Sequence, residues 1–435
     1  MTPGKDLISG GDSRPLAWHR GRVVTVGEFR LEAGRVAAAL PASGVPVLNL
    51  CEDRFRFLLA YAAAALRGVA SLLPPSRAPD VVAEVAACFD EAFVCDDEWV
   101  AAAATGSGPG SSCAADRDTA TVTYTSGSTG RPQPHARAWS GLVKCTHAKR
   151  GLLGPELDGS GGHWIVATVP AQHMYGLEFS VLLPLLGDCA VHCGRPILPA
   201  DVADALREVP GRRVLVTTPL HLRVLVESGI PMPTIDRVIC ATAPLDPALA
   251  GCVEAAWRCP VLEVFGSTET CAIAQREPVR QARWSPFDGV SLVADDVGAR
   301  VCAPWLPGFV RLLDRVDVDE GGRFVVIGRN SDLIEVAGKR ASLGDLTRRL
   351  LGVEGVRDAV VVQVEGGRAE LRRVAALVVA PGLRPDIILE RLRVGVDPVF
   401  LPRPLLIVDA LPRNELGKLS RERVLEALGI LPPAD

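Results

Sequence analysis

The 12 cysteines of the chain never form a Cys-x-x-Cys pair, and the formal net charge is only −4. Scattered cysteines in a chain of 435 residues indicate buried or free thiols in a reducing compartment. Cys189, His192 and Cys193 lie close together, but no second ligand pair at zinc-site spacing follows them, so a strand core is expected there. The weak charge gives no support to binding of nucleic acids or anionic membranes.

Long hydrophobic runs are also missing. The most apolar helical stretch, Phe57 to Leu66, is interrupted by Arg67 and is too short to span a bilayer. The first residues contain Asp6 and Asp12 and lack the apolar region of a secretory signal. We therefore expect a cytoplasmic protein that has no membrane partner.

No Walker A sequence is present, although one loop has the composition of a phosphate site. In "TVTYTSGSTGRP" (121–132) a strand runs into serines, threonines and glycines, and Gly130 is followed by Arg131-Pro132 in place of Gly-Lys-Ser/Thr. The loop is either a flexible surface turn or a cradle whose N–H groups and hydroxyls bind phosphate. A segment that can be helical, Ala138 to Arg150, follows it.

Alternating strand and helix patterns fill the rest of the chain. "VPVLNL" precedes "FRFLLAYAAAAL", "HWIVATVP" precedes "LEFSVLLPLL", and "RRVLVTT" precedes "LHLRVLVES". This alternation predicts an α/β fold with mostly parallel strands. The pattern changes near Gly328-Arg329, after which short strands and helices predict a compact α+β domain. The expected organisation is thus a large domain over 1–328 and a small domain over 329–435.

Three further segments accompany the loop in a fixed order. They are "EVFGSTET" (263–270), "LLDRVDVDEGGRFVVIGRNSDLIEVAGKR" (312–340) and "LPRNELGKLSRERV" (411–424). Together with the loop they resemble the adenylate-forming superfamily, which comprises acyl-CoA and aryl-CoA synthetases, nonribosomal-peptide adenylation domains and luciferases. The resemblance covers about residues 119 to 424. It implies a large N-terminal domain of several subdomains and a small, mobile C-terminal domain.

The resemblance assigns the nucleotide site. It implies that a single loop grips the β- and γ-phosphates of ATP through Thr125, Ser126, Gly127, Ser128, Thr129 and Gly130. It further implies that Thr268 touches the α-phosphate, beside Gly266, and that Glu269 holds Mg²⁺, a cation that prefers carboxylate and phosphate oxygens. Without the resemblance, Glu269 would be read as a solvated residue at a helix start.

The resemblance also assigns the ribose, adenine and acyl contacts. Asp314, helped by Arg329, matches the acid that binds the ribose hydroxyls, and "CATAPL" (240–245) matches the segment that lines the adenine and acyl pockets with Ala243 and Pro244. Phe265 matches an aromatic residue against adenine. A surface aspartate and a core phenylalanine are the alternatives.

Two residues would serve the chemistry itself. His173, in "VPAQHMYG", matches a residue that faces the acyl carboxylate, although a structural histidine is the alternative. Lys418 matches the lysine that bridges the substrate carboxylate and the α-phosphate, where a mobile charge stabilises the transition state. Otherwise it would be one exposed lysine among many.

The chain departs from the family pattern at three positions. Gln133 stands where the family has a lysine, Ser331 where many members have a hinge Asp or Lys, and Glu335 where many have a lysine. We expect a ligase that uses ATP and Mg²⁺ to form an acyl or aryl adenylate with release of pyrophosphate. Transfer to a thiol, either of CoA or of an acyl carrier protein, would follow. The rivals are transfer to an amine, activation of a small inorganic acid such as nitrite, and a non-catalytic nucleotide-binding relative.

Overall fold

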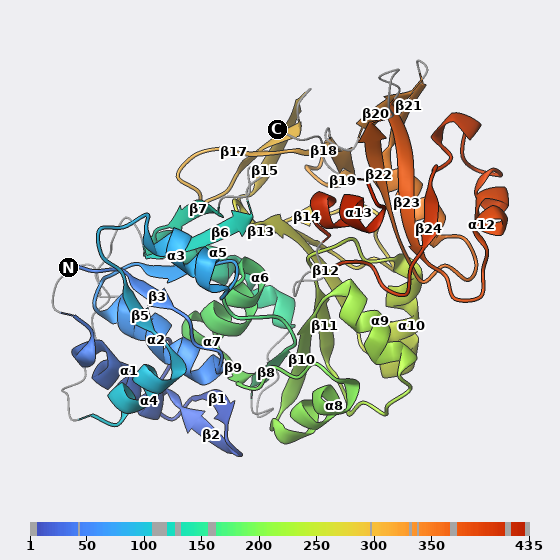
Figure 1. The fold of residues 1–435 in the computed structure, drawn as a ribbon. Coiled ribbons are helices and arrows are strands. Elements are labelled where there is room, and N and C mark those ends of the chain that lie inside the picture. Colours follow the sequence, from blue (N-terminus) through green and yellow to red (C-terminus); the bar gives the residue numbers. More distant parts are fainter. Residues whose placement is uncertain are drawn as a thin grey trace. The chain divides into compact units, whose positions relative to one another are not determined.

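Two compact units make up the chain (Figure 1). Unit 1 comprises Met1–Ser291 and Cys302–Val310, and unit 2 comprises Leu292–Val301 and Arg311–Asp435. The computed structural model describes residues 7–41, 44–106, 120–126, 132–154, 162–295, 298–329, 333–336, 339–365, 372–413 and 419–430. The boundary expected at Gly328-Arg329 falls inside unit 2, and a hinge at that position stays a prediction.

The first sheet of unit 1 has five strands in the order β5-β3-β4-β6-β7. All neighbours are parallel except β6 and β7, which form an antiparallel pair. The strands are β3 (Val47–Asn49), β4 (Ser71–Leu73), β5 (Phe93–Cys95), β6 (Thr121–Ser126) and β7 (Pro132–Arg137). The helices of this region are α1 (Val26–Ala39), α2 (Arg54–Leu66), α3 (Pro79–Ala86) and α4 (Asp97–Ala104).

The second sheet of unit 1 has nine strands in the order β14-β13-β12-β11-β10-β8-β9-β1-β2. Its middle, from β12 to β1, is parallel, and its two ends are antiparallel. The strands are β1 (Pro15–His19), β2 (Arg22–Thr25), β8 (His163–Ala167), β9 (Cys189–His192), β10 (Arg212–Thr217), β11 (Arg237–Cys240), β12 (Val261–Ser267), β13 (Cys271–Arg276) and β14 (Ser285–Pro286). Cys189 and His192 of β9 and the following Cys193 are buried, as predicted for a strand core.

Helices cover this sheet and supply its core. They are α5 (Trp139–Lys149), α6 (Met174–Leu177), α7 (Leu183–Leu186), α8 (Pro199–Glu208), α9 (Pro219–Glu227) and α10 (Pro247–Trp257), with a 3₁₀ turn at Arg150–Leu153 and a π-helical turn at Glu178–Leu182. Prolines in the first turn suit the starts of α8, α9 and α10, because the first N–H groups of a helix need no internal partner. Leu206, Leu225 and Val253 from these three helices pack on Leu215 and Val238 of the sheet.

Unit 2 is built from small sheets. Three strands form one sheet: β15 (Ser291–Asp295), β16 (Gly298–Cys302) and β17 (Val310–Leu312). Two hairpins follow: β18 (Asp314–Val318) with β19 (Phe324–Arg329), and β20 (Leu333–Val336) with β21 (Lys339–Ser342). The last sheet contains β22 (Asp358–Glu365), β23 (Arg372–Val379) and β24 (Leu405–Ile407), and the helices are α11 (Leu343–Leu351), α12 (Pro385–Leu392) and α13 (Arg421–Ala427), with a 3₁₀ turn at Pro398–Phe400.

The mixture of strands and helices agrees with the predicted fold class, an α/β large part followed by an α+β small part. Within the described residues, every helix is too short or too polar to reach across a bilayer.

Candidate active site

The predicted site residues of unit 1 lie at or just after the carboxyl ends of strands in its two sheets. The segments that carry them directly follow β6, β8, β11 and β12, each of which belongs to a parallel pair. Ligands of open α/β sheets bind outside the carboxyl ends of the strands, where loops and helix starts meet. The sheet topology therefore favours a ligand site formed by these segments.

The predicted phosphate loop joins two paired strands. Thr125 and Ser126 end β6, and Thr125 lies opposite Gln133 of β7. Gly127, Ser128, Thr129 and Gly130 lie outside the described residues, so their role stays a prediction. The helix predicted after the loop is present as α5, but the sequence did not reveal the intervening strand β7, because Pro132 and Pro134 argue against a strand. An edge strand tolerates prolines, since its outward N–H groups need no partner.

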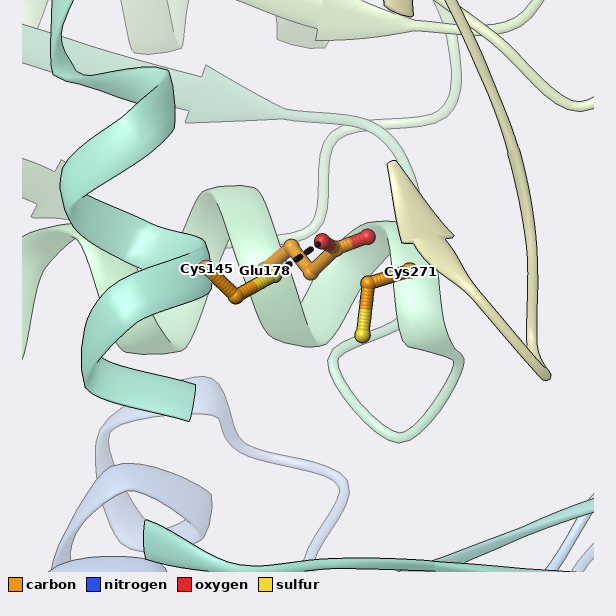
Figure 2. Close-up of side chains that lie close together, drawn as sticks. All are labelled: Cys145, Glu178 and Cys271. Carbon is orange, nitrogen blue, oxygen red and sulfur yellow. Dashed lines mark hydrogen bonds between the residues drawn. The ribbon is translucent and has the colours of Figure 1, made fainter. Parts of the chain in front are cut away.

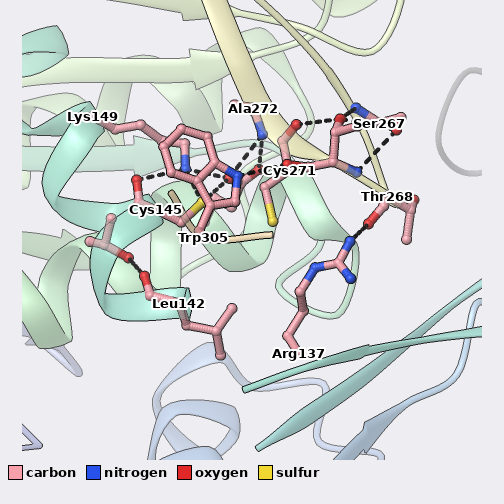
Figure 3. Close-up of polar contacts among 12 residues, drawn as sticks. Arg137, Leu142, Cys145, Lys149, Ser267, Thr268, Cys271, Ala272 and Trp305 are labelled. Atoms are coloured by element: carbon pink, nitrogen blue, oxygen red, sulfur yellow. Dashed lines mark hydrogen bonds and ion pairs between the residues drawn. The ribbon is translucent and has the colours of Figure 1, made fainter. Parts of the chain in front are cut away.

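The turn that carries Thr268 and Glu269 (residues 267–271, the β12–β13 turn) is held at several backbone atoms (Figure 3). The Ser267 N–H donates to Thr270 Oγ1 at 3.0 Å, and Arg137 Nη2 donates to the Thr268 carbonyl at 2.8 Å. The same guanidinium nitrogen also donates to the Glu269 carbonyl. Since Arg137 ends β7, the strand after the predicted phosphate loop fixes the turn that carries the predicted metal ligand.

Gly266 permits the close approach of β12 and β13. A Cβ at this position would lie 2.2 Å from the Cys271 carbonyl oxygen and 2.6 Å from the Ala272 Cα. The strand register shifts between Phe265 and Gly266. A glycine is therefore required here by backbone packing, and its predicted role in nucleotide binding stays a prediction.

His135 of β7 connects the two predicted halves of the phosphate and metal site. Its Nε2 lies 2.9 Å from Thr125 Oγ1 and 3.7 Å from Glu269 Oε1. Burial, the largest effect, lowers the pKa of His135, while Glu269 raises it and Arg137 lowers it further. The imidazole is thus predominantly neutral at pH 7 and can exchange a hydrogen bond with the threonine hydroxyl.

Sequence reasoning missed His135 and Arg137 as site residues. Both alternate with Gln133 along β7, so all three side chains share one face of the strand. The position of Gln133 was already recognised as a departure from the family pattern. Had β7 been recognised as a strand, the residues two and four positions after Gln133 would have pointed to the same face.

Glu269 has the chemistry that a Mg²⁺ site requires. Its side chain is 40% exposed, so the carboxylate oxygens remain accessible to an ion and to phosphate oxygens. Oxygen ligands from one or two carboxylates, completed by phosphates and water, suit Mg²⁺. The chemistry and exposure of Glu269 therefore fit a Mg²⁺ ligand, and its role in holding the metal stays a prediction.

The segment predicted to line the adenine and acyl pockets follows β11. Ala243 and Pro244 are exposed, and the neighbouring Leu245 is buried. Thr242 has a φ of 84°, a left-handed conformation that is unfavourable for a β-branched residue. Phe265 is half-buried, and its ring centroid lies 5.3 Å from that of Trp284. Contacts of these residues with a nucleotide stay predictions.

His173 lies at the start of α6, after β8. Its side chain is half-buried, and its carbonyl accepts a hydrogen bond from the Leu177 N–H at 2.7 Å. Tyr175, two residues later, donates to the Ile239 carbonyl of β11 at 2.8 Å, which ties this helix to the neighbouring strand. His173 is therefore located near the same edge of the sheet as the loop after β11, and its role toward the acyl carboxylate stays a prediction.

The predicted ribose residues of unit 2 face each other in one hairpin. Asp314 begins β18 and Arg329 ends β19, and their Cα atoms are direct partners in the antiparallel register. Glu335 of β20 is opposite Arg340 of β21. Lys418 and Ser331 lie outside the described residues. The two residues are thus neighbours in the sheet, and their role toward the ribose stays a prediction.

Cys145 and Glu178 form a buried cluster with Cys271, the last residue of the β12–β13 turn (Figure 2). These three residue types can bind metals, but the Lys149 ammonium already lies 2.5 Å from Glu178 Oε1 and 2.5 Å from Cys145 Sγ. A second cation beside the ammonium would be repelled. The cluster is therefore a buried ion-pair network.

Comparisons with known proteins agree with this geometry. Residues 74–305 match the model of a family described as AMP-binding enzyme. A 4-coumarate–CoA ligase from Halorhodospira halophila is 31% identical over 311 residues, which are 68% of this chain and 73% of that protein. A fatty acid–acyl-carrier-protein ligase from Streptomyces coeruleorubidus is 26% identical, over 69% of this chain and 65% of that protein. The ATP-bound structure of MatB from Rhodopseudomonas palustris has the same fold, with a TM-score of 0.80 and 19% identity over 96% of each chain.

The chain therefore belongs to the AMP-binding enzyme family, within the adenylate-forming superfamily. The resemblance deduced from the four motifs is confirmed. So is the predicted class of enzyme, an AMP-forming ligase that activates an acid.

Proposed function

We propose that the chain activates a carboxylic acid and transfers the acyl group to the thiol of CoA. A carboxylate oxygen attacks the α-phosphorus of ATP, and pyrophosphate leaves with the bonding electrons. The thiol sulfur then attacks the acyl carbon, the thiol proton is lost to solvent, and AMP leaves. The single observation that carries the proposal is the cluster of Thr125, His135 and Glu269, which joins the predicted phosphate loop to the predicted metal turn.

The protein's own residues mainly orient and stabilise charge. Thr125 and the loop after it bind the β- and γ-phosphates, while Arg137 fixes the carbonyls of Thr268 and Glu269 so that both side chains face the phosphates. Glu269 would hold Mg²⁺, and the metal would supply positive charge that stabilises pyrophosphate as a leaving group. Lys418 adds a mobile charge at the α-phosphate. Catalysis through such placement and charge stabilisation is characteristic of transfer at phosphorus.

A pyrophosphate-release screen tests the proposal. Purified enzyme with Mg·ATP is offered aryl, fatty, amino and small inorganic acids, and the product nucleotide is identified. We expect AMP and pyrophosphate with one class of carboxylic acid. Acid-dependent formation of ADP would overturn the assignment, and turnover with nitrite alone would replace the carboxylic acid by an inorganic one.

A carrier protein is the second candidate acceptor. The carrier-protein ligase of Streptomyces coeruleorubidus, which matches this chain over 69% of its length, supports this option. The enzyme with its acid is therefore offered CoA, pantetheine, a holo-carrier protein and an amine in parallel. Rapid capture by the holo-carrier alone would replace CoA as the acceptor, and capture by the amine alone would favour an amide-forming ligase. A cytoplasmic location and the lack of a nucleic-acid partner stay predictions.

A further inference from the structure

Two buried carboxylates of unit 1, Glu178 and Glu263, have no part in the reaction described above. They are 4% and 2% exposed, and each forms an ion pair with one cation. Glu178 also accepts the N–H of Ala272, which directly follows the β12–β13 turn, and Glu263 accepts the N–H of Leu245 in the segment assigned to the adenine and acyl pockets. We propose that the two ion pairs are separate positioning groups: Lys149–Glu178 positions the β12–β13 turn for the metal, and Arg276–Glu263 positions the 241–245 loop for the nucleotide base. The inference rests on the proposed function.

The first pair contacts the backbone directly after the turn that carries Glu269. Glu178 Oε1 and Oε2 accept the Ala272 N–H at 3.1 and 3.2 Å, three residues after Glu269. Lys149 Nζ lies 2.5 Å from Glu178 Oε1 and 5.6 Å from the ring centroid of Trp305. One charged cluster therefore lies against the carboxyl end of the turn.

Trp305 extends this cluster to a second backbone atom. Its Nε1 donates to the Thr270 carbonyl at 2.9 Å. The ammonium against its ring holds the indole in place through a cation–π contact. The backbone from Thr268 to Ala272 is therefore restrained by Arg137, Glu178 and Trp305. Lys149 of α5 acts on it only through its contacts with Glu178 and Trp305.

The second pair holds the loop that follows β11. Glu263 Oε1 accepts the Leu245 N–H at 2.7 Å, and Glu263 Oε2 accepts from Arg276 Nε at 2.7 Å. Thr242 within this loop has a left-handed φ, so the loop needs an outside contact to keep its conformation. The Arg276 guanidinium also lies 4.4 Å from the ring centroid of Trp284, which contacts Phe265. This pair thus reaches both segments that are assigned to the base.

Stability alone is a weak reason for two buried ion pairs. Removing charges from water costs free energy that the attraction within the pair only partly offsets, so well-packed apolar residues of similar size often stabilise a protein as much or more. A buried carboxylate that also accepts a backbone N–H has a directional role that an apolar side chain cannot take. The geometry therefore points to positioning.

The experiment compares Glu178→Gln and Glu263→Gln in the full-length enzyme. Each substitution removes one buried carboxylate charge and keeps a carbonyl oxygen, so each variant is the matched control for the other. Three quantities are measured: the melting temperature, the Mg²⁺ concentration for half-maximal pyrophosphate exchange, and the affinity for AMP without metal by calorimetry. Binding of Mn²⁺ in the presence of a non-hydrolysable ATP analogue, followed by EPR, reports on the metal site without turnover.

The two variants are expected to change different quantities, one the binding of the metal and the other the binding of AMP. Glu178→Gln raises the Mg²⁺ requirement and weakens Mn²⁺ binding about tenfold, the range found for groups that support a metal ligand, with little change in AMP affinity. Glu263→Gln weakens AMP binding about tenfold, the effect of one charged hydrogen bond, and leaves Mn²⁺ binding unchanged. Equal changes in the same quantity for both variants, or a change in melting temperature alone, would overturn the inference.

Double variants separate positioning from stability. In Lys149→Met/Glu178→Gln no charge is left unpaired, so the melting temperature recovers, while we expect the high Mg²⁺ requirement to remain. The conservative variant Lys149→Arg keeps the ion pair, so its Mg²⁺ requirement should stay at the wild-type value. Recovery of the Mg²⁺ requirement in the neutral double variant would show that the pair only stabilises the fold. A wild-type enzyme without acid-dependent pyrophosphate exchange would instead refute the proposed function, whatever the AMP and Mn²⁺ titrations show.

Discussion

Two ion pairs of unit 1 differ from one ion pair of unit 2 in burial and in contact with the backbone. In unit 1 the pairs Lys149–Glu178 and Arg276–Glu263 are buried, and their carboxylates accept backbone N–H groups beside the candidate site. In unit 2, Arg384–Asp386 has side chains that are 80% and 58% exposed. Exposed ion pairs contribute little to stability because water and salt screen them. The contrast indicates that burial and a backbone contact together distinguish a positioning charge from an ordinary surface charge.

The largest effect is expected for Lys418→Ala, which tests whether unit 2 contributes to the reaction through the charge of this lysine. Lys418→Ala should lower the rate of adenylation about a hundredfold or more, because a charge that stabilises the transition state is lost. The affinity for ATP should stay close to that of the wild type. Pyrophosphate exchange and calorimetry measure the two quantities. Equal loss of both would mean that Lys418 supports binding or folding instead.

The next largest effect is expected for Glu269, the half-exposed carboxylate of unit 1 that is predicted to bind the metal. Glu269→Gln keeps the size of the side chain and removes its charge, so the Mg²⁺ concentration for half-maximal activity should rise at least about tenfold. A magnesium titration of the exchange reaction checks this. An unchanged titration curve would remove Glu269 from the metal site.

A smaller effect is expected for Arg413–Asp358, the described ion pair of unit 2 that is most similar in burial to the two pairs of unit 1. Arg413 donates to both carboxylate oxygens of Asp358, at 3.0 and 2.8 Å, and the two side chains are 23% and 21% exposed. The backbone of Arg413 also forms an isolated antiparallel β-bridge with Leu419, the residue that follows Lys418 in the sequence. Asp358→Asn should cost about 1 kcal/mol of stability and lower adenylation severalfold, measured by denaturant unfolding and pyrophosphate exchange. Loss of stability without any loss of adenylation would separate this pair from those of unit 1.

The smallest effect is expected at the exposed surface of unit 2. Asp386 has a lowered pKa, chiefly because of its hydrogen bond with Arg384. Both side chains are nevertheless largely in water. Arg384→Ala should leave the melting temperature and the adenylation rate within experimental error. A clear loss of either would show that exposed pairs in unit 2 matter more than the comparison implies.

Much of the architecture was predictable because its signals are local. Runs of β-branched residues such as "RRVLVTT" become β10, and the patterns "DAVVVQVE" and "SLGDLTRRLL" become β22 and α11. Strand β7 was missed because its two prolines hide an edge strand that pairs with β6. Tertiary pairing there overrides the local pattern.

The supporting side chains of the site could not be predicted in the same way. Nothing in the sequence around Lys149 distinguishes it from an exposed lysine, and its partner Glu178 comes from a separate helical segment. Likewise, the contact of Arg137 with Thr268 joins two motifs that are distant in the chain. Motif order identifies residues that touch the ligand, whereas the side chains behind them are recognised only once the strands are paired.

The π-helical turn at Glu178–Leu182 sets the angular phase of its helix. A π turn holds one residue more than an α-helical turn, and such turns occur often at functional sites. Successive residues of an α-helix are separated by about 100° around the axis. Deleting one residue within 179–182 would rotate Glu178 by that angle relative to α7, so its carboxylate would leave the Ala272 amide while the apolar face of α7 stayed in place. The extra residue of the π-helical turn thus gives the helix two faces. Its carboxyl-terminal part, α7, packs in the core, while Glu178 at the start of the turn reaches the Ala272 N–H beside the candidate site.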